Sequence, residues 1–381
     1  MNFLTESQSA WERILTAMEQ QQNVVLYGTG NGADKIVDFC EVNKVPIAGI
    51  FVSDEFCRGQ NFRGHRVESY AQITERLGKD FLLVIAFASE LPELLNRFQE
   101  LNRQHETIAP HLGLFNEDLA DREWFAIHEK ELTAAYELLA DEWSKNVFQD
   151  MLNFKFSGKM KYLFHHATKR KDDIAFLELN DNEVYYDLGA YDGDTLFEAE
   201  PQTKRKAQGA KFNDWKIVAV EADAKNFNKL KLRIEGQGAR VKEYRLINKA
   251  VWKDENGIEF SAKSGRSASV YKTNPSAFGT SPNWEAHRRI IASTTIDAIA
   301  KETGWEPTYI KMDLEGADKE ALTGGAATIR RCHPKLFIAA YHFNEDLFLI
   351  PLILHQLNPN YQIYLRKHPY VPDWEINYIV K

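Results

Sequence analysis

The sequence has little cysteine and no long hydrophobic run. Both shortages limit the class of protein to which it can belong. Its 381 residues include only three cysteines, Cys40, Cys57 and Cys332, with no C-x-x-C spacing. This pattern argues against a disulfide framework and against a zinc site. The longest strongly apolar stretch, residues 81–88, is far too short to span a bilayer, and the first residues lack the basic leader and apolar core of a signal peptide. We therefore expect a soluble, cytoplasmic protein without membrane insertion.

An excess of basic residues is also missing. Lys and Arg total 47 against 55 for Asp and Glu, which gives a formal net charge of −8. Such a balance does not favour nucleic acid or an anionic membrane as a partner. The chain does contain enough apolar residues, 44% of the total, for ordinary buried cores, and its length is typical of two domains. The sequence leaves formation of a homo-oligomer open.

Strand-like and helix-like segments alternate over the first hundred or so residues. Residues 2–22 carry apolar side chains at helical spacing and predict a helix. An apolar segment then leads into a glycine turn, GTGNGA at residues 28–33, and the next apolar segment ends in Asp54. The spacing suits a nucleotide site, but the same glycines also suit a tight turn in an assembly or acceptor-presenting module. Both interpretations stay open within a predicted Rossmann-like domain over residues 1–115.

The middle of the chain has a helical pattern. Between residues 116 and 175, apolar residues recur at helical spacing among charged ones, without the Pro, Gly and Ser enrichment of a disordered tether. We expect a helical connector here that ends in the basic run at residues 165–173. That run is more typical of a solvated helix C-terminus than of a site for an anionic substrate.

Residues 184–195, VYYDLGAYDGDT, carry the strongest functional signal. A strand-forming segment runs directly into a turn with Gly189 and Gly193, where backbone can approach a ligand closely. About thirty residues later, a second apolar segment ends in Glu221. A carboxylate at this spacing is placed to accept hydrogen bonds from the hydroxyls of a ribose. The two features together predict a site for a nucleoside-containing cofactor.

The same turn is acidic, because it holds Asp187, Asp192 and Asp194. A turn built for phosphate has few carboxylates, so this one favours a cofactor with positive charge and no phosphate. S-adenosylmethionine, with its sulfonium and ammonium groups, fits that description. A dinucleotide oxidoreductase is the alternative from the turn alone, and Asp194 by itself is also typical of a helix N-cap.

Several motifs in the second half of the chain belong together. The most specific is IKMDLEG, within the segment from Thr294 to Gly325, and it is accompanied by YDLGAYDGDT, VEAD, NKAVW and the segment at residues 339–354. These motifs resemble the FkbM family of S-adenosylmethionine-dependent methyltransferases. The resemblance extends from about residue 176 to the C-terminus. It implies a class I methyltransferase domain over residues 176–381, with a seven-stranded, mostly parallel sheet. The expected fold class is therefore α/β, with two doubly wound Rossmann-like units.

The resemblance also implies a function and a partner. Family members transfer a methyl group, usually to an oxygen of a sugar, glycan or related small molecule, and they differ in acceptor. The first domain resembles the Rossmann-like units that precede some sugar-modifying transferases, where a nucleotide-sugar docks. The leading hypothesis is thus an O-methyltransferase that acts on a sugar, a nucleotide-sugar or another small molecule. The alternatives are a nucleotide- or sugar-binding module with the methyltransferase domain as scaffold, and an NAD-dependent oxidoreductase.

The expected donor site lies at the carboxyl ends of the first three strands of this domain. The turn after the first strand is expected beside the methionine and ribose, Glu221 at the ribose hydroxyls, and Asn248 and Ala250 beside the adenine. Asn248 is equally typical of a turn. The candidates for binding S-adenosyl-L-methionine are Asp187, Gly189, Tyr191, Gly193, Asp194, Thr195, Glu221, Asn248 and Ala250.

The candidates for the chemistry follow the fourth and fifth strands. Asp313 and Glu315 stand two residues apart, so extended backbone places both on one face. We expect them to position the acceptor, and we expect no metal ion because no nearby His or Cys completes a ligand set, although oxygen-only magnesium sites leave little trace. His342 is the candidate general base, with Lys311 and the two carboxylates as substitutes. A histidine satisfied by hydrogen bonds at a strand end is the alternative.

A long polar insert separates the third and fourth strands. Residues 252–283 contain Gly and Ser and predict a hairpin with an extended loop. Inserts of this length beside a cofactor site are more often lids or acceptor surfaces than packing elements. We expect this insert to contribute to acceptor specificity.

Overall fold

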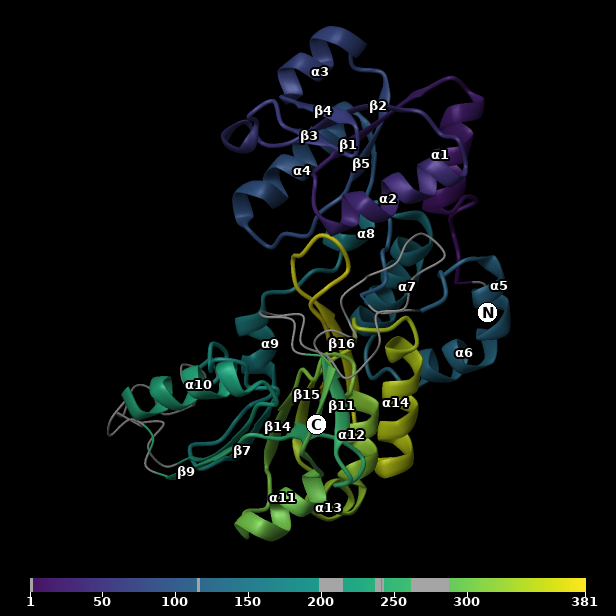
Figure 1. Cartoon of the computed structure of the whole chain (residues 1–381). Coiled ribbons are helices and arrows are strands. Elements are labelled where there is room, and N and C mark those ends of the chain that lie inside the picture. The colour runs from purple at the N-terminus through teal and green to yellow at the C-terminus, as the bar shows by residue number, and fades with distance from the viewer. Residues whose placement is uncertain (1–2, 115–116, 199–214, 237–240, 242, 262–287) are drawn as a thin grey trace.

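The computed structural model contains two sheets, each flanked by helices, and a group of helices that joins them (Figure 1). We call residues 3–114 the first unit and residues 184–380 the second unit. In Figure 1 the first unit, in purple and blue, lies above the second, in green and yellow. The structure describes residues 3–114, 117–198, 215–236, 241, 243–261 and 288–381.

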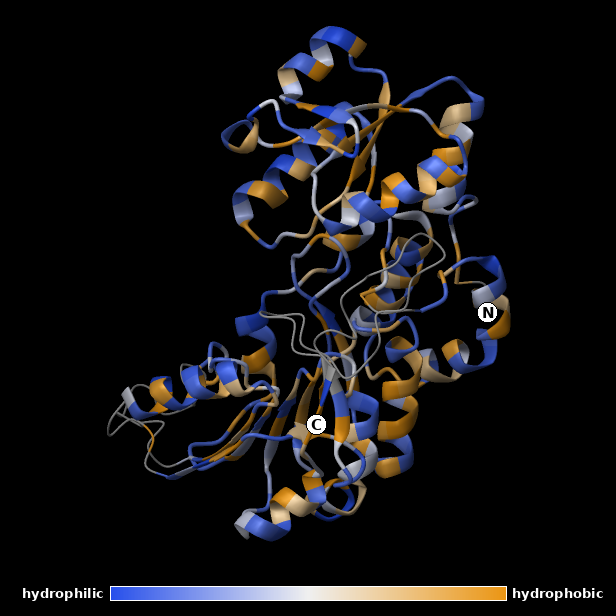
Figure 2. Ribbon diagram, viewed as in Figure 1, coloured by the Kyte–Doolittle hydropathy of each residue, from blue (hydrophilic) through white to orange (hydrophobic). Residues whose placement is uncertain are grey.

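The first unit is built on a six-stranded sheet in the order β3-β4-β2-β1-β5-β6. All neighbouring strands pair in parallel except β3 and β4, which form an antiparallel pair at one edge. The strands are apolar and buried in the middle of the sheet, as Figure 2 shows in orange, because helices cover both faces. The elements are α1 (Ala10–Glu19), β1 (Asn23–Tyr27), α2 (Asn31–Val42), β2 (Ile47–Phe51), β3 (Asn61–Phe62), β4 (His65–Glu68), α3 (Tyr70–Leu77), β5 (Phe81–Ile85), α4 (Pro92–Gln104) and β6 (Glu106–Ile108).

The first helix is shorter than the sequence pattern predicts. It begins at Ala10 because Ser9 forms a capping box, in which the Ser9 side chain accepts from the Glu12 N–H and the Glu12 side chain accepts from the Ser9 N–H. The residues before it contact the joining helices instead, since the Thr5 N–H donates to Asn153 Oδ1 at 2.8 Å. The expected helix over residues 2–22 is therefore wrong at its N-terminal end.

The joining helices tie the two sheets into one apolar core. They are α5 (Arg122–Ile127), α6 (Glu129–Glu137), α7 (Glu142–Ser157), α8 (Lys161–Phe164) and α9 (Arg170–Phe176). Phe148 and Phe154 of α7 are fully buried, and they belong to a hydrophobic cluster that includes strand residues of both sheets. The basic run at residues 165–173 is not a helix C-terminus as expected, because α8 ends at Phe164 and α9 begins at Arg170. Arg170 thus lies in the first turn of a helix.

The second unit is built on a seven-stranded sheet in the order β16-β17-β15-β14-β7-β8-β9. Six strands run in one direction, and β17 runs antiparallel to both of its neighbours, β15 and β16. The strands are β7 (Val184–Leu188), β8 (Lys216–Val220), β9 (Glu243–Ile247), β14 (Tyr309–Met312), β15 (Lys335–Ala339), β16 (Ile363–Lys367) and β17 (Ile376–Val380). The helices are α10 (Ala224–Gly236), α11 (Ile296–Thr303), α12 (Asp318–Gly324), α13 (Ala326–Cys332) and α14 (Asp346–Leu357). The predicted α/β class and the mostly parallel seven-stranded sheet are confirmed.

The order of these strands defines where a ligand can lie. The chain starts the sheet at β7, continues outward through β8 and β9, and then returns to place β14 on the other side of β7. Such a reversal opens a crevice outside the carboxyl ends of the strands, and ligands of open α/β sheets bind there. The turn after β7 and the ends of β8 and β14 meet at this crevice.

The hairpin predicted within residues 252–283 is wrong in its second strand, because the partner of the strand in this insert begins only at Arg288. Strand β11 (Ile258–Ser261) pairs antiparallel with β12 (Arg288–Ile291). Beside it, β10 (Ala250–Val251) pairs in parallel with β13 (Ser293–Thr294). The loop expected to contact the acceptor falls largely within residues 262–287, which lie outside the described part of the chain.

Candidate active site

A cavity of about 340 Å³ opens at the carboxyl edge of the second sheet. Its volume lies in the range of small-molecule sites, and its position is the crevice where the strand order reverses. Most of the candidates from the sequence line it, namely Gly189, Tyr191, Asp194, Thr195, Glu221, Ala250, Asp313 and Glu315. The structure thus brings the donor-side and acceptor-side candidates to one cavity.

Glu221 is held rigidly at the donor side of the cavity. Its carboxylate accepts hydrogen bonds from the backbone N–H groups of Tyr191, at 2.9 Å, and Asp223, at 2.7 Å. Tyr191 reaches it from a left-handed backbone conformation, with φ of 49°. Burial raises the pKa of Glu221 to about 7, although both N–H groups favour its charged form. A carboxylate that is buried and still lines a cavity is placed to accept hydrogen bonds from ligand hydroxyls.

Gly189 is required for the contact between two turns. Its φ is +78°, and a Cβ atom there would lie 2.0 Å from the backbone oxygen of Asp313. Glycine therefore lets the turn after β7 pack directly on the turn after β14, which holds the donor and acceptor sides of the cavity together. The sequence predicts close approach of backbone to a ligand at Gly189, and the structure adds this close approach of backbone to backbone.

Three donor-site candidates, Asp187, Gly193 and Asn248, do not line the cavity. Asp187 is completely buried, and its Oδ1 lies 3.3 Å from the Nζ of Lys311, which does line the cavity. Burial raises the pKa of Asp187, against the influence of Lys311. Gly193 has φ of +83° and packs near Leu230. Asn248 donates from Nδ2 to the backbone oxygen of Glu221 at 2.8 Å and so fastens the end of β8. These residues support the site without forming its wall.

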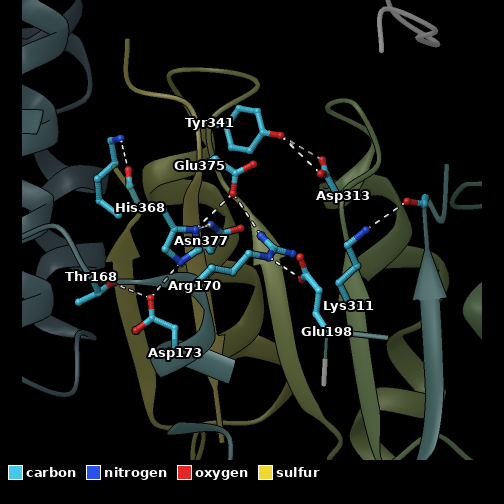
Figure 3. A network of polar contacts seen from close by, with 12 residues as sticks. Thr168, Arg170, Asp173, Glu198, Lys311, Asp313, Tyr341, His368, Glu375 and Asn377 are labelled. Carbon is cyan, nitrogen blue, oxygen red and sulfur yellow. Dashed lines mark hydrogen bonds and ion pairs between the residues drawn. The ribbon is translucent and has the colours of Figure 1, made fainter. Parts of the chain in front are cut away.

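Asp313 and Glu315 form the acceptor side with an aromatic neighbour. The hydroxyl of Tyr341 donates towards both carboxylate oxygens of Asp313 at 3.4 Å, as Figure 3 shows. Tyr341 lines the same cavity. Glu315 has a left-handed backbone, with φ of 51°. Strained backbone conformations of this kind cluster at functional sites.

His342 lies behind these carboxylates and is completely buried. Its Nε2 is 3.5 Å from Asp313 Oδ1 and 3.7 Å from Glu315 Oε2, and His342 does not belong to the cavity wall. Burial lowers the pKa of His342, although nearby carboxylates oppose the shift. The imidazole is therefore neutral near pH 7 and able to take up a proton, and its route to the cavity runs through Asp313 or Glu315.

A network of charged side chains forms the floor of the cavity, and the sequence does not predict it (Figure 3). The Arg170 guanidinium donates to Glu198 at 2.7 Å and to Glu375 at 3.2 Å. His368 lies between two carboxylates, with Nε2 3.0 Å from Asp173 and Nδ1 3.3 Å from Glu375. Glu375 is partly buried, which would raise its pKa, yet His368 and Arg170 lower that pKa to about 2. The only sequence signal for this network is the basic run that contains Arg170.

Neither a metal ligand cluster nor a membrane-spanning helix is found among the described residues. No group of three or more His, Cys, Asp or Glu side chains in these parts of the chain is arranged to hold a metal ion. None of the helices there combines the length and the apolar character that a membrane span needs.

The chain is similar to known methyltransferases. Residues 187–363 match the model of the methyltransferase FkbM domain. The crystal structure of a methyltransferase FkbM from Methylobacillus flagellatus KT aligns over 96% of this chain and 92% of its own chain. The sequence identity is 19% and the TM-score is 0.67. No curated protein is significantly similar to the chain in sequence.

Smaller methyltransferases show weaker likenesses. An rRNA methylase from Streptococcus thermophilus covers 55% of this chain and 92% of its own, with 12% identity and a TM-score of 0.33. The structure of an O-methyltransferase from Bacillus cereus, in complex with S-adenosylhomocysteine, aligns over 68% of this chain and 99% of its own chain. The sequence identity is 11% and the TM-score is 0.30.

The family assignment agrees with the geometry of the site. The matched residues begin at Asp187, at the start of the turn that forms the donor side, and they include Glu221, Asp313 and His342. The buried carboxylate of Glu221 at the cavity wall fits a ribose, and the acidic turn fits a cationic cofactor. Residues 187–363 of this chain therefore match an FkbM methyltransferase domain, and this match indicates S-adenosyl-L-methionine as the methyl donor.

Proposed function

We propose that the protein transfers a methyl group to a hydroxyl oxygen of a sugar, a glycan or a related small molecule. One observation carries the proposal. The carboxylates of Asp313 and Glu315 face the same cavity as Glu221, across the switch point of the sheet. Carboxylates accept hydrogen bonds from hydroxyl groups, so an acceptor alcohol fits beside them.

The donor side positions the cofactor through Glu221 and the turn that carries Tyr191. Glu221 is the residue for the ribose hydroxyls, and Ala250 leaves room beside the adenine. When bound, the cofactor supplies an electrophilic methyl group on a sulfonium. The turn after β7 would hold this cofactor beside the turn that carries Asp313, because Gly189 lets the two turns pack in direct contact. Alignment of donor and acceptor can supply roughly 7 to 11 kcal/mol of the barrier reduction.

The acceptor side removes the hydroxyl proton. The Asp313 carboxylate would accept the O–H proton of the acceptor as its oxygen is methylated, and the bound cofactor would supply the methyl group together with a neutral thioether leaving group. His342, 3.5 Å behind Asp313, is neutral and takes the proton onward. Base catalysis of this kind contributes typically about 10²- to 10⁴-fold, so it is the smaller of the two effects. Glu315 holds the acceptor in place.

Variants of the acceptor side test this proposal. Asp313→Asn and His342→Ala should each lower kcat by roughly 10²- to 10⁴-fold and leave the affinity for S-adenosylhomocysteine unchanged. His355→Ala is the matched control, because His355 is exposed on α14. Methyl transfer is measured with a radiolabelled donor across a panel of sugars and nucleotide-sugars.

Two results would change the assignment. A fully active His342→Ala enzyme would leave proton removal to Asp313 and solvent. Loss of activity in EDTA that magnesium restores would move Asp313 and Glu315 from acceptor binding to metal ligation. A chain that binds the donor but methylates no hydroxyl in the panel, and instead methylates nitrogen or carbon, would contradict the proposed O-methylation.

A further inference from the structure

We propose that Glu90, from the first unit, recognises the methyl acceptor, and that the acceptor presents hydroxyl or protonated amino groups to it and no phosphate. Glu90 follows β5 of the first sheet and lines the cavity of the second unit. The inference rests on the proposed methyl transfer in that cavity. It gives the first unit a direct part in substrate choice, separate from any nucleotide site at its own glycine turn.

The loop that carries Glu90 is fastened to the second unit by backbone hydrogen bonds. The Ser89 N–H donates to the Val371 oxygen at 2.8 Å, and the Val371 N–H donates to the Ser89 oxygen at 3.0 Å. The Ser89 side chain also accepts from the Leu91 N–H at 3.1 Å. A reciprocal pair of this kind fixes the backbone on both sides of residue 90. The position of Glu90 is therefore set by the loop between β16 and β17.

A buried ionic cluster also fixes the loop between β16 and β17. The Asp373 carboxylate contacts His111 Nδ1 at 2.8 Å and Lys155 Nζ at 2.7 Å, and all three side chains are buried. His111 comes from the first unit and Lys155 from α7, so one carboxylate of the second unit joins three parts of the chain. Breaking a buried, paired charge is costly, and the two units are thus held in one arrangement around the cavity.

Glu90 lies on the acceptor side of the cavity. Its neighbour Val371 belongs to the loop that leads into β17, and β17 pairs with β15. In the sheet, β15 and β17 lie on one side of β14, whereas β8, which ends at Glu221, lies on the other side. Donor and acceptor sides are therefore separated by β14, and Glu90 stands with Tyr341 and Glu375 on the acceptor side.

The charges on this side select the acceptor. Glu90, Asp313, Glu315 and Glu375 all face the cavity. Of the basic side chains that also line it, Arg170 is shared by Glu198 and Glu375, Lys311 contacts Asp187, and Lys249 follows β9 on the donor side. Among the described residues, no hydrogen bond or ion pair is recorded for the Glu90 carboxylate. A phosphate group on this side of the cavity would be repelled by these carboxylates. Hydroxyl and ammonium groups, in contrast, can donate hydrogen bonds to them. The geometry favours an uncharged or amino-bearing polyol over a sugar phosphate.

Sugar binding to the full chain saturated with S-adenosylhomocysteine tests the inference. Calorimetry compares D-glucosamine with glucose 6-phosphate for the unaltered protein, for Glu90→Gln and for Glu93→Gln. Glu93 is the matched control, because it is exposed on α4 and does not line the cavity. We expect glucosamine to bind more tightly than glucose 6-phosphate, and Glu90→Gln alone to weaken it roughly three- to tenfold.

The outcomes separate this inference from the proposed function. Failure of S-adenosylhomocysteine to bind would count against the donor site itself. If S-adenosylhomocysteine binds normally, any of three results would overturn the role of Glu90. These are no binding of glucosamine, tighter binding of glucose 6-phosphate than of glucosamine, or unchanged glucosamine affinity in Glu90→Gln. Glu90→Gln must also leave the Tm and the affinity for S-adenosylhomocysteine unchanged, because a structural role would shift both.

Discussion

Each unit of the chain contains a glycine turn directly after a strand, but the surroundings of the two turns differ in the part of the chain that the structure describes. After β1, aromatic rings pack around the turn. The Tyr27 ring lies 4.5 Å from that of Phe51 and 4.9 Å from that of Phe87, measured between centroids, and a Cβ on Gly28 would lie 2.6 Å from Phe87. After β7, the turn faces a cavity of about 340 Å³ lined with carboxylates. The same local pattern thus serves packing in one place and a site in the other.

The carboxylates after the second strand of each unit differ in the same way. Asp54 is exposed and starts a short 3-10 helix, Asp54–Phe56. Glu221 is only 9% exposed and accepts two backbone N–H groups. Spacing of glycines and a carboxylate is therefore a weak indicator of a nucleoside site by itself. The indicator becomes specific when the backbone of the turn reaches the carboxylate and orients it.

Exchange of one glycine in each turn should give the largest contrast between the units. Gly189→Ala places a Cβ against the Asp313 oxygen at a φ of +78°, so it should lower the free energy of unfolding by roughly 2 to 4 kcal/mol and weaken S-adenosylhomocysteine about a hundredfold. Gly30→Ala meets no atom within 4 Å and should change the free energy of unfolding by less than about 1 kcal/mol. Chemical denaturation and calorimetry measure both. Equal effects at the two glycines would remove the contrast.

Removal of one carboxylate in each unit should give the next largest effect. Glu221→Ala takes away a charged acceptor for the ribose hydroxyls and should weaken S-adenosylhomocysteine at least about tenfold in a folded protein. Asp54→Ala, as the matched change in the first unit, should leave that affinity unaltered. Calorimetry decides between them. A folded Glu221→Ala variant with full affinity would show that the ribose lies elsewhere, and NADH bound tightly at this site would favour the oxidoreductase alternative.

The pH dependence of S-adenosylhomocysteine binding tests the role of Glu221 further. The expected change in affinity is similar to, or smaller than, that of Glu221→Ala. The pKa of Glu221 is raised to about 7, and the charged form is the one that accepts from hydroxyls. The affinity for S-adenosylhomocysteine should therefore fall by roughly tenfold between pH 8 and pH 6, and this fall should be absent in Glu221→Gln. The same raised pKa stabilises the unliganded fold below pH 4.5, and that contribution is lost as the pH rises through 7. Calorimetry at three pH values checks the slope, and an equal slope in the variant would assign it to another group.

The sequence predicts the sheets better than the site. Strands such as β8 and β15 of the second sheet are largely apolar runs, because strands covered on both faces by helices bury apolar side chains on both sides. The acidic turn and Glu221 stand next to such runs, and they could be placed from spacing alone. The start of α1 was also readable, since Ser9 and Glu12 form a capping-box signature that limits the amphipathic pattern.

The residues that sequence reasoning missed come together only in three dimensions. His368 and Glu375 lie in the loop between β16 and β17, which reaches the cavity because β17 runs antiparallel beside β15. Glu90 arrives from the other unit through the pairing of Ser89 with Val371. No local pattern marks such residues, because their roles depend on contacts between segments far apart in the sequence, such as Asp173 and His368, which are 195 residues apart. The roles assigned to all site residues stay predictions, and Asp187, Gly193, Asn248 and His342 do not line the cavity.

A crystal structure of the full chain with S-adenosylhomocysteine tests the central claim most directly, because it locates the donor in one unit or the other. The account predicts one ligand in the cavity of the second unit, with both ribose hydroxyls within hydrogen-bond distance of the Glu221 carboxylate and the sulfur directed towards Asp313. A ligand at the glycine turn after β1, or a ribose in the second unit that does not contact Glu221, would contradict it.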